Sequence, residues 1–210
     1  MNHRSFVTFL TLARAPLVLL GCLAALLQGL RFQNSVPLLV VAVAMLGASA
    51  ITDMFDGKLA RKWHVTSRFG ALADPLMDKF FYAVSLPCAT FLAARSGDWT
   101  HAGLLLALDV VSMLRDQWVT FLRAVGSAYG ADCRANWFGK FRTAMSFPII
   151  CAVYLYLGLL AMGALGAGAA AVLRHVLYAL EALQIGVTLV TADAYTRQYM
   201  PYMRRSMSDK

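Results

Sequence analysis

The residues of this sequence best suited to chemistry are four aspartates within positions 53–78 of a chain that is mostly apolar. They are Asp53, Asp56, Asp74 and Asp78. Helical residues three or four positions apart share a face, so each pair projects from one side of its helix. If the two helices pack side by side, the four carboxylates converge, and in an apolar setting they cannot all stay ionised without a counter-charge. One or two Mg²⁺ or Mn²⁺ ions would supply that charge, because these ions prefer oxygen ligands.

Arg61 and Gly57, in the same stretch, suit a ligand that contains phosphate. Arg61 lies about two helical turns beyond Asp53, and its guanidinium is a planar fork that matches phosphate oxygens. Gly57 has no Cβ, so a ligand or a neighbouring helix can approach its backbone closely. The stretch therefore combines predicted metal ligands with a predicted phosphate contact.

The elements that would position these residues are long apolar helices. The chain is 60% hydrophobic and has a mean hydropathy of +0.61, outside the range of soluble domains. Its Leu-, Ala- and Val-rich segments are near the ~20 residues that cross a bilayer as a helix, and they do not read as barrel strands. We predict an all-α integral membrane protein in which residues 1–210 form a single domain. Ionisable groups in such segments usually mark functional sites, which weighs against acids that merely pair with Arg61 and Lys79.

Six transmembrane helices are predicted, preceded by a short N-terminal surface helix within residues 1–14. The expected spans are residues 10–29, 37–62, 70–94, 102–127, 139 up to a Gly/Ala-rich turn at 158–170, and 171–194. In the fourth span Asp109, Asp116 and Arg123 recur every seven residues, which places them on one stripe and predicts a cavity wall. Glu181 in the sixth span has several open roles: a polar partner at a helix contact or subunit interface, or a polar cavity.

The distribution of Lys and Arg predicts how the helices are oriented. Arg31, Arg95 and Arg174 fall on one side, and the other sixteen of the nineteen basic residues fall on the opposite side or in the half-spans nearest it. Basic residues are enriched on the cytoplasmic side of membrane proteins. We therefore predict a multi-pass protein of the cytoplasmic (inner) membrane, with both termini and the aspartates facing the cytoplasm. Anionic headgroups and substrates account for the net charge of +8, and nucleic acid is not an expected partner.

The pattern D-x2-D-G-x2-A-R-x8-G-x3-D-x3-D, from Asp53 to Asp78, resembles the signature of the CDP-alcohol phosphotransferase family at every defined position. The resemblance implies transfer of a substituted phosphate from a CDP-linked donor to an alcohol, with release of CMP. It also implies two magnesium or manganese ions on the four aspartates, with Asp78 as the general base for the attacking hydroxyl. Gly57, Arg61 and Ser67 would hold the nucleotide, although Ser67 also reads as an ordinary loop serine.

Beyond this motif, the chain is most similar to the phosphatidylglycerophosphate synthase branch of the family. The matching blocks are Leu10-Thr11-x2-Arg14, Arg115-Asp116, Leu122-Arg123 and Trp137-x-Gly139-Lys140-x-Arg142-Thr143. This resemblance implies CDP-diacylglycerol as donor and glycerol 3-phosphate as acceptor. A dianionic acceptor needs a cationic pocket besides the metals. The candidates for that pocket are Arg14, Arg115, Arg123, Lys140 and Arg142.

Some features leave the acceptor open. The pocket residues also read as snorkelling or positive-inside cations. Asp116 stands where the branch usually has Glu, and Arg142 where it usually has Lys, so the same chemistry with inositol phosphate, serine or another alcohol is an alternative. An aspartate-rich polyprenyl transferase is a further alternative, which Gly57 and Ala60-Arg61 argue against, and a cation transporter is another. The resemblance also implies a homodimer surrounded by membrane lipids.

Overall fold

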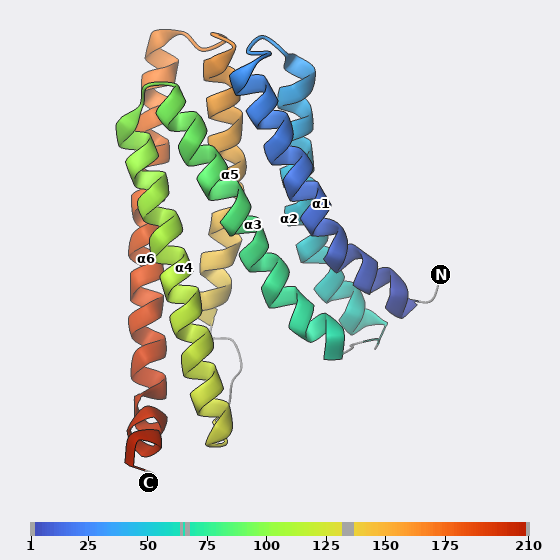
Figure 1. Ribbon diagram of the computed structural model, residues 1–210, viewed down its shortest axis with the longest axis vertical. Helices are drawn as coiled ribbons and strands as arrows, with labels where there is room; N and C mark the ends of the chain where they lie inside the picture. Colours follow the sequence, from blue (N-terminus) through green and yellow to red (C-terminus); the bar gives the residue numbers. More distant parts are fainter. Residues whose placement is uncertain (1–2, 64, 66–67, 132–136, 209–210) are drawn as a thin grey trace.

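The computed structural model is a bundle of long antiparallel helices (Figure 1). It describes residues 3–63, 65, 68–131 and 137–208, and within these the side chains of residues 3–4, 54, 56–57, 60–61, 68–72, 74–75, 78 and 137–140 are outside the description. The described residues form six helices: α1 (His3–Leu30), α2 (Val36–Lys62), α3 (Arg68–Arg95), α4 (Trp99–Ala128), α5 (Trp137–Ala161) and α6 (Ala167–Ser208). The all-helical prediction is confirmed, and each predicted span falls within one of these helices.

The core of the bundle lies where α1 packs against α2 and α3, α4 packs against α3 and α6, and α5 contacts α1, α2, α3 and α6. Its centre holds fully buried apolar side chains such as Val18, Leu46, Phe81, Leu105 and Tyr154. A smaller cluster joins α4 to α6 nearer the C-terminus: Val119, Leu122, Tyr195 and Tyr199. Figure 1 shows α4 and α6 running together beyond the lower ends of α1, α2 and α3.

The turn between α3 and α4 is built from short polar contacts. Gly97 takes a left-handed conformation with φ of +84°, which glycine adopts without steric cost. The side chain of Asp98 caps α4 by accepting a hydrogen bond from the His101 N–H at 3.0 Å, and it accepts another from the Tyr178 hydroxyl at 2.5 Å. Although partial burial favours the neutral acid, these hydrogen bonds hold the pKa of Asp98 below its usual value. Because Tyr178 belongs to α6, the cap also ties this turn to α6.

Glu181 is fully buried at the contact between α4 and α6. One of its carboxyl oxygens is hydrogen-bonded to His101 Nε2 at 2.7 Å, and the His101 side chain is equally inaccessible. Burying either polar group without a partner would be costly, so the pair offsets part of the desolvation of both. Of the roles left open by the sequence, the structure assigns Glu181 that of a polar partner at a helix contact within the chain.

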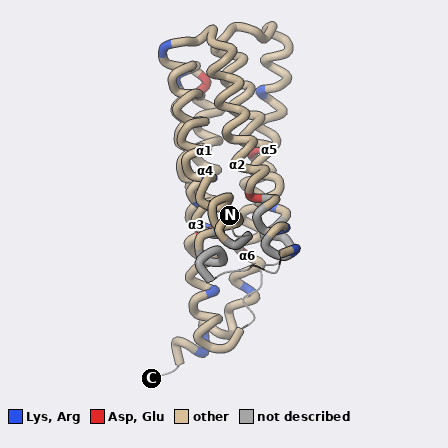
Figure 2. Tube along the Cα trace, turned by 90° about the vertical axis from the view of Figure 1, so that its right-hand side faces the viewer, with Lys and Arg blue, Asp and Glu red and all other residues tan. Residues whose placement is uncertain are grey.

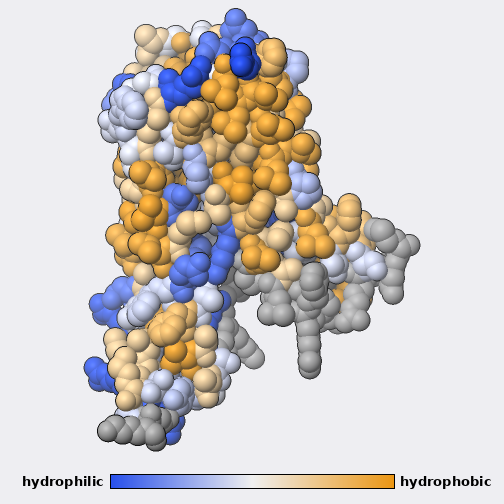
Figure 3. Space-filling model, in the orientation of Figure 1, coloured by the Kyte–Doolittle hydropathy of each residue, from blue (hydrophilic) through white to orange (hydrophobic). Residues whose placement is uncertain are grey.

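The outer surface of the bundle fits a lipid environment. Large apolar side chains such as Leu20, Leu23, Val40 and Leu114 point outward, and apolar side chains cover much of the upper part of the face shown in Figure 3. Lys and Arg recur toward the lower end, near the C-terminus (Figure 2). Four segments among the described residues are long and apolar enough to cross a membrane: Ser5–Leu30, Val36–Asp53, Phe141–Ala161 and Ala167–Ser208. The protein is therefore a multi-pass membrane protein.

Two boundaries differ from the sequence prediction. From residue 3 onward, no separate surface helix precedes the first span, because α1 is continuous from His3 to Leu30. The polar residues Thr11 and Arg14 are buried inside the bundle rather than lying along the headgroups. At the other end, α6 continues to Ser208, beyond the predicted limit of 194. The part of α6 beyond residue 194 packs on α4, which stabilises the helix where the apolar run has ended.

Gly158 in α5 packs closely against α1 and α2. A Cβ at this position would overlap Leu39 Cδ1 and lie 2.9 Å from Gln28 Oε1, while Gln28 Nε2 donates a hydrogen bond to the Gly158 carbonyl at 3.2 Å. We expect Gly158→Ala to reduce the free energy of unfolding by about 1–3 kcal/mol, as overpacking usually does. A fall in Tm of the detergent-purified protein would report this loss.

Gly186→Ala provides the matched control. Gly186 is also helical, and a methyl group added there would find none of the described atoms within 4 Å. This substitution is expected to leave Tm unchanged or raise it, because alanine favours a helix over glycine by roughly 0.5–1 kcal/mol. Equal losses in both variants would contradict the packing argument.

Candidate active site

The predicted metal-ligand motif lies on α2 and α3, near the lower ends of these helices in Figure 1. Both helices pack against α1. Asp53 is the member of the motif whose side chain is described. The other predicted residues have side chains outside the description, or lie outside the described residues altogether: Asp56, Gly57, Arg61, Ser67, Asp74, Asp78 and Lys140. Convergence of the four carboxylates therefore stays a prediction.

Arg14 from α1 forms an ion pair with Asp53 from α2. The arginine side chain is only 2% exposed and the aspartate 20% exposed. This contact places Arg14 beside one of the predicted metal ligands. A buried guanidinium at this point adds positive charge where a diphosphate would meet the aspartates.

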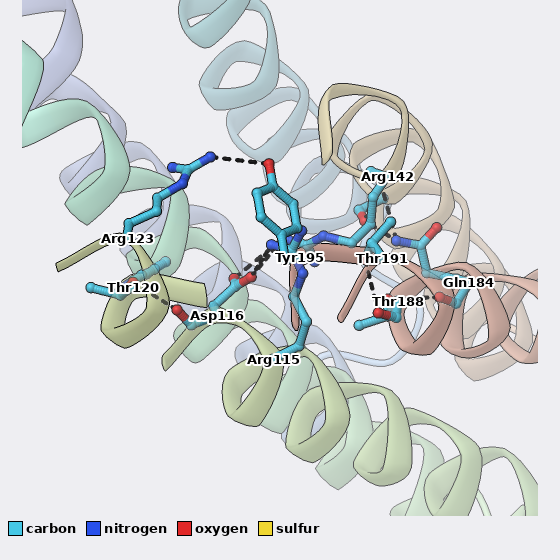
Figure 4. Close-up of polar contacts among 11 residues, drawn as sticks. Arg115, Asp116, Thr120, Arg123, Arg142, Gln184, Thr188, Thr191 and Tyr195 are labelled. Carbon is cyan, nitrogen blue, oxygen red and sulfur yellow. Dashed lines mark hydrogen bonds and ion pairs between the residues drawn. The ribbon is translucent and has the colours of Figure 1, made fainter. Parts of the chain in front are cut away.

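The other described pocket candidates come together around Asp116, between α4, α5 and α6 (Figure 4). Arg142 Nη2 donates to both carboxylate oxygens of Asp116, at 3.0 and 3.2 Å, and Arg115 Nη1 donates to one of them at 2.8 Å. We call Arg115, Asp116, Arg123, Arg142 and Tyr195 the arginine cluster. Sequence spacing alone did not predict that Asp116 would join two of the candidate cations.

Tyr195 from α6 is the aromatic member of the arginine cluster. The guanidinium carbon of Arg115 lies 5.2 Å from the centre of its ring and that of Arg123 lies 5.3 Å away. Its hydroxyl accepts a hydrogen bond from Arg123 Nη2 at 3.1 Å. Arg142 lies over a different ring, that of Tyr82 in α3, at 5.7 Å. The arginine cluster thus combines side chains from three helices, α4, α5 and α6.

Gln184 holds the turn of α5 that carries Arg142. Its Nε2 donates to the Arg142 carbonyl at 3.2 Å and also to the Ser146 hydroxyl. The Ser146 hydroxyl in turn donates to the same carbonyl at 2.9 Å. All three residues are buried, so these bonds fix α5 against α6 at the level of the arginine cluster.

The arginine cluster retains hydrogen-bond donors that no other described residue uses. Nε and Nη2 of Arg115, and Nε and Nη1 of Arg142, are buried and have no partner among the described residues. Among the described residues, two guanidinium groups face one carboxylate, which leaves an excess positive charge. Buried unpaired donors on cations are costly unless an anion satisfies them. The cluster is therefore a site that favours an anion with several oxygens, such as a phosphate monoester.

The donor chemistry of the motif suits a hard divalent cation. Asp53 offers carboxylate oxygens, which Mg²⁺ and Mn²⁺ prefer. Among the side chains that the structure describes, no group of three or more His, Cys, Asp or Glu residues is arranged to hold a metal ion. Three of the four predicted ligands lie outside that description, so the predicted metal centre rests on their types and spacing.

Comparison with known proteins gives a consistent family. The sequence profile described as CDP-alcohol phosphatidyltransferase matches residues 5–189. A CDP-diacylglycerol--glycerol-3-phosphate 3-phosphatidyltransferase from Pectobacterium atrosepticum is 30% identical over 149 residues, covering 70% of this chain and 74% of the relative. Proteins of the same name are 32% identical over 98 residues in Sodalis glossinidius and 29% identical over 102 residues in Escherichia coli K12. In these two the match spans about half of the relative, 50% and 53%.

Proposed function

The chain belongs to the CDP-alcohol phosphatidyltransferase family, and from that membership we propose that it transfers the phosphatidyl group of CDP-diacylglycerol to glycerol 3-phosphate. The products are phosphatidylglycerophosphate and CMP. The family match agrees with the motif and does not favour a polyprenyl transferase or a cation transporter. Relatives named for glycerol 3-phosphate, at about 30% identity, support this acceptor. The arginine cluster gives separate support for an acceptor that carries a phosphate.

The observation that supports a phosphorylated acceptor is the set of buried guanidinium donors on Arg115 and Arg142 that have no partner in the described part of the chain. Free inositol has no anionic group to satisfy them, and serine offers only a carboxylate next to its own ammonium group. Glycerol 3-phosphate brings a dianion whose oxygens match guanidinium forks. Arg123 and Lys140 complete the pocket in this proposal, and Arg14 acts beside Asp53, nearer the donor diphosphate.

In the proposed reaction, the acceptor hydroxyl attacks the phosphorus that carries the diacylglycerol. Asp78 takes the hydroxyl proton, a new oxygen–phosphorus bond forms, and the bond to the CMP phosphate breaks. Gly57, Arg61 and Ser67 hold the nucleotide so that CMP leaves in line. Magnesium or manganese bound by Asp53, Asp56, Asp74 and Asp78 would supply positive charge to the diphosphate and the leaving phosphate.

The membrane arrangement completes the proposal. All six helices span the cytoplasmic membrane as one domain, and the termini and the motif face the cytoplasm, where glycerol 3-phosphate and CMP are soluble. Arg31, Arg95 and Arg174 then mark the outer end. The lipid donor enters sideways from the bilayer, and the protein works as a homodimer, as the resemblance implies.

The direct test is CMP release from CDP-diacylglycerol by the detergent-purified protein. We expect release to require glycerol 3-phosphate, and a panel of serine, inositol and inositol phosphate would identify any other acceptor. Failure to release CMP with every acceptor, from a well-folded protein, would contradict the proposed transfer.

Removal of divalent cations is expected to reduce CMP release by roughly 100-fold or more, since metal ions usually supply several kcal/mol to such a transition state. Adding Mg²⁺ or Mn²⁺ after EDTA treatment should restore the rate. Potassium chloride at the same ionic strength should not, and full activity in EDTA would contradict the two-metal mechanism.

A further inference from the structure

Tyr195 lies outside the part of the chain that the family profile matches, which ends at residue 189. Yet its ring is fully buried and contacts two arginines of the proposed acceptor pocket. We propose that Tyr195 is a positioning residue that holds Arg115 and Arg123 in place and so sets the affinity for a phosphorylated acceptor. This inference rests on the proposed function.

The attraction between the Tyr195 ring and the two arginines is electrostatic. Arg115 and Arg123 are two helical turns apart on α4, and both guanidinium groups lie within 5.3 Å of the centre of the same ring. The π face of an aromatic ring carries partial negative charge and attracts cations. The ring therefore stabilises two like-charged groups near one another, which would otherwise separate toward water, as long arginine side chains readily do.

The contact with the Tyr195 ring leaves hydrogen-bond donors of Arg115 available. A contact through the ring face holds Arg115 without consuming its N–H groups, and Nε and Nη2 of Arg115 are still without a partner among the described residues. A second carboxylate in this place would have occupied those donors. Tyr195 thus orients the arginine while leaving its hydrogen-bonding capacity for an anion.

Tyr195 is itself held in place by packing on its neighbours. Its ring stacks on Tyr199 one turn later, with centres 6.4 Å apart and planes 14° apart. Both belong to the small cluster with Val119 and Leu122 on α4. Figure 4 shows Tyr195 reaching from α6 to a place between Arg123 and the Arg115–Asp116 contact. Packing of α4 on α6 therefore fixes the position of the Tyr195 ring within the arginine cluster.

Two substitutions of Tyr195 separate its contributions. Tyr195→Phe keeps the ring but removes the hydroxyl that accepts from Arg123, and should raise the KM for glycerol 3-phosphate by roughly 2- to 5-fold. Tyr195→Leu removes the ring contacts as well and should raise this KM by roughly 5- to 30-fold. In both variants we expect kcat and the KM for CDP-diacylglycerol to stay within about twofold of wild type, since neither the donor nor the transition state meets Tyr195.

Leu105→Ala is the matched control, because Leu105 is also fully buried on α4 but belongs to the main core cluster, which does not include Tyr195. Its KM for glycerol 3-phosphate should stay near wild type even though its Tm falls. If the control variant raised this KM as much as Tyr195→Leu does, Tyr195 would act only through packing. An unchanged KM in folded Tyr195→Phe and Tyr195→Leu would also overturn the proposal.

A binding measurement distinguishes failure of this inference from failure of the proposed function. Inorganic phosphate should raise the Tm of the wild-type protein in detergent, and should raise it less in Tyr195→Phe and less again in Tyr195→Leu. If phosphate stabilises the protein in this order but no CMP forms with glycerol 3-phosphate, the proposed acceptor is wrong and the role of Tyr195 stands. If the three proteins respond equally to phosphate, the role of Tyr195 is wrong whatever the acceptor.

Discussion

Replacing Asp78 with asparagine is expected to reduce the rate of CMP release by about 10³-fold or more. The amide has nearly the shape of the carboxylate, but it cannot accept the proton of the attacking hydroxyl, a function that contributes typically 10²- to 10⁴-fold. It is also a neutral and weaker ligand for magnesium or manganese. The measurement is the initial rate at saturating donor and acceptor, with folding checked by size-exclusion chromatography in detergent.

Asp109→Asn is the control for this prediction. Asp109 is also an aspartate within a long helix of the bundle, α4, and is 8% exposed, but it lies outside the motif. One of its carboxyl oxygens is buried without a partner among the described residues. A neutral asparagine side chain should therefore be tolerated there more easily than a charged carboxylate. We expect this variant to keep a rate within about twofold of wild type. An Asp78→Asn protein that keeps more than a tenth of the wild-type rate would remove the general base from the mechanism.

Replacing Arg142 with glutamine should raise the KM for glycerol 3-phosphate by about 30-fold or more. Truncating one partner of a buried, hydrogen-bonded charge pair usually costs about 2–5 kcal/mol of binding. Here the change removes a guanidinium that donates to both oxygens of Asp116 and carries two buried donors without a partner among the residues described. The KM for CDP-diacylglycerol should change little, because the proposed donor site is the motif on α2 and α3.

Arg197→Gln tests whether any lost arginine would have this effect. Arg197 also pairs with an aspartate, Asp193, but its side chain is 79% exposed on α6. Exposed pairs of this kind contribute little, about 0–1 kcal/mol. The KM for glycerol 3-phosphate should stay at the wild-type value. If Arg142→Gln raised the KM for donor and acceptor equally, the arginine cluster would not be an acceptor pocket.

Much of the fold could be predicted from the sequence, because apolar runs of membrane length leave few alternatives to helices. The predicted spans at 37–62 and 70–94 lie within two residues of α2 and α3. The motif from Asp53 to Asp78 was sufficient to indicate the family, which the comparisons show. It does not by itself place the side chains of Asp56, Asp74 and Asp78, whose convergence remains predicted.

What the sequence could not supply were contacts between residues far apart in the chain. The ion pair of Arg14 with Asp53 joins positions 39 apart, and that of Arg142 with Asp116 joins positions 26 apart. Hydropathy also ended the sixth span at 194, one residue before Tyr195, because the apolar run stops there. The spacing of Tyr195 and Tyr199 by four was the available signal for a continuing helix with a packed face.

Asp116 has a consequence for how strongly the arginine cluster can hold an anion. A phosphate group that reaches the remaining donors of Arg115 and Arg142 binds beside a carboxylate that both guanidinium groups already hold. The two anions then share the same cations, so repulsion from Asp116 offsets part of the attraction. The resident carboxylate thereby weakens the hold on phosphate and keeps its occupancy reversible.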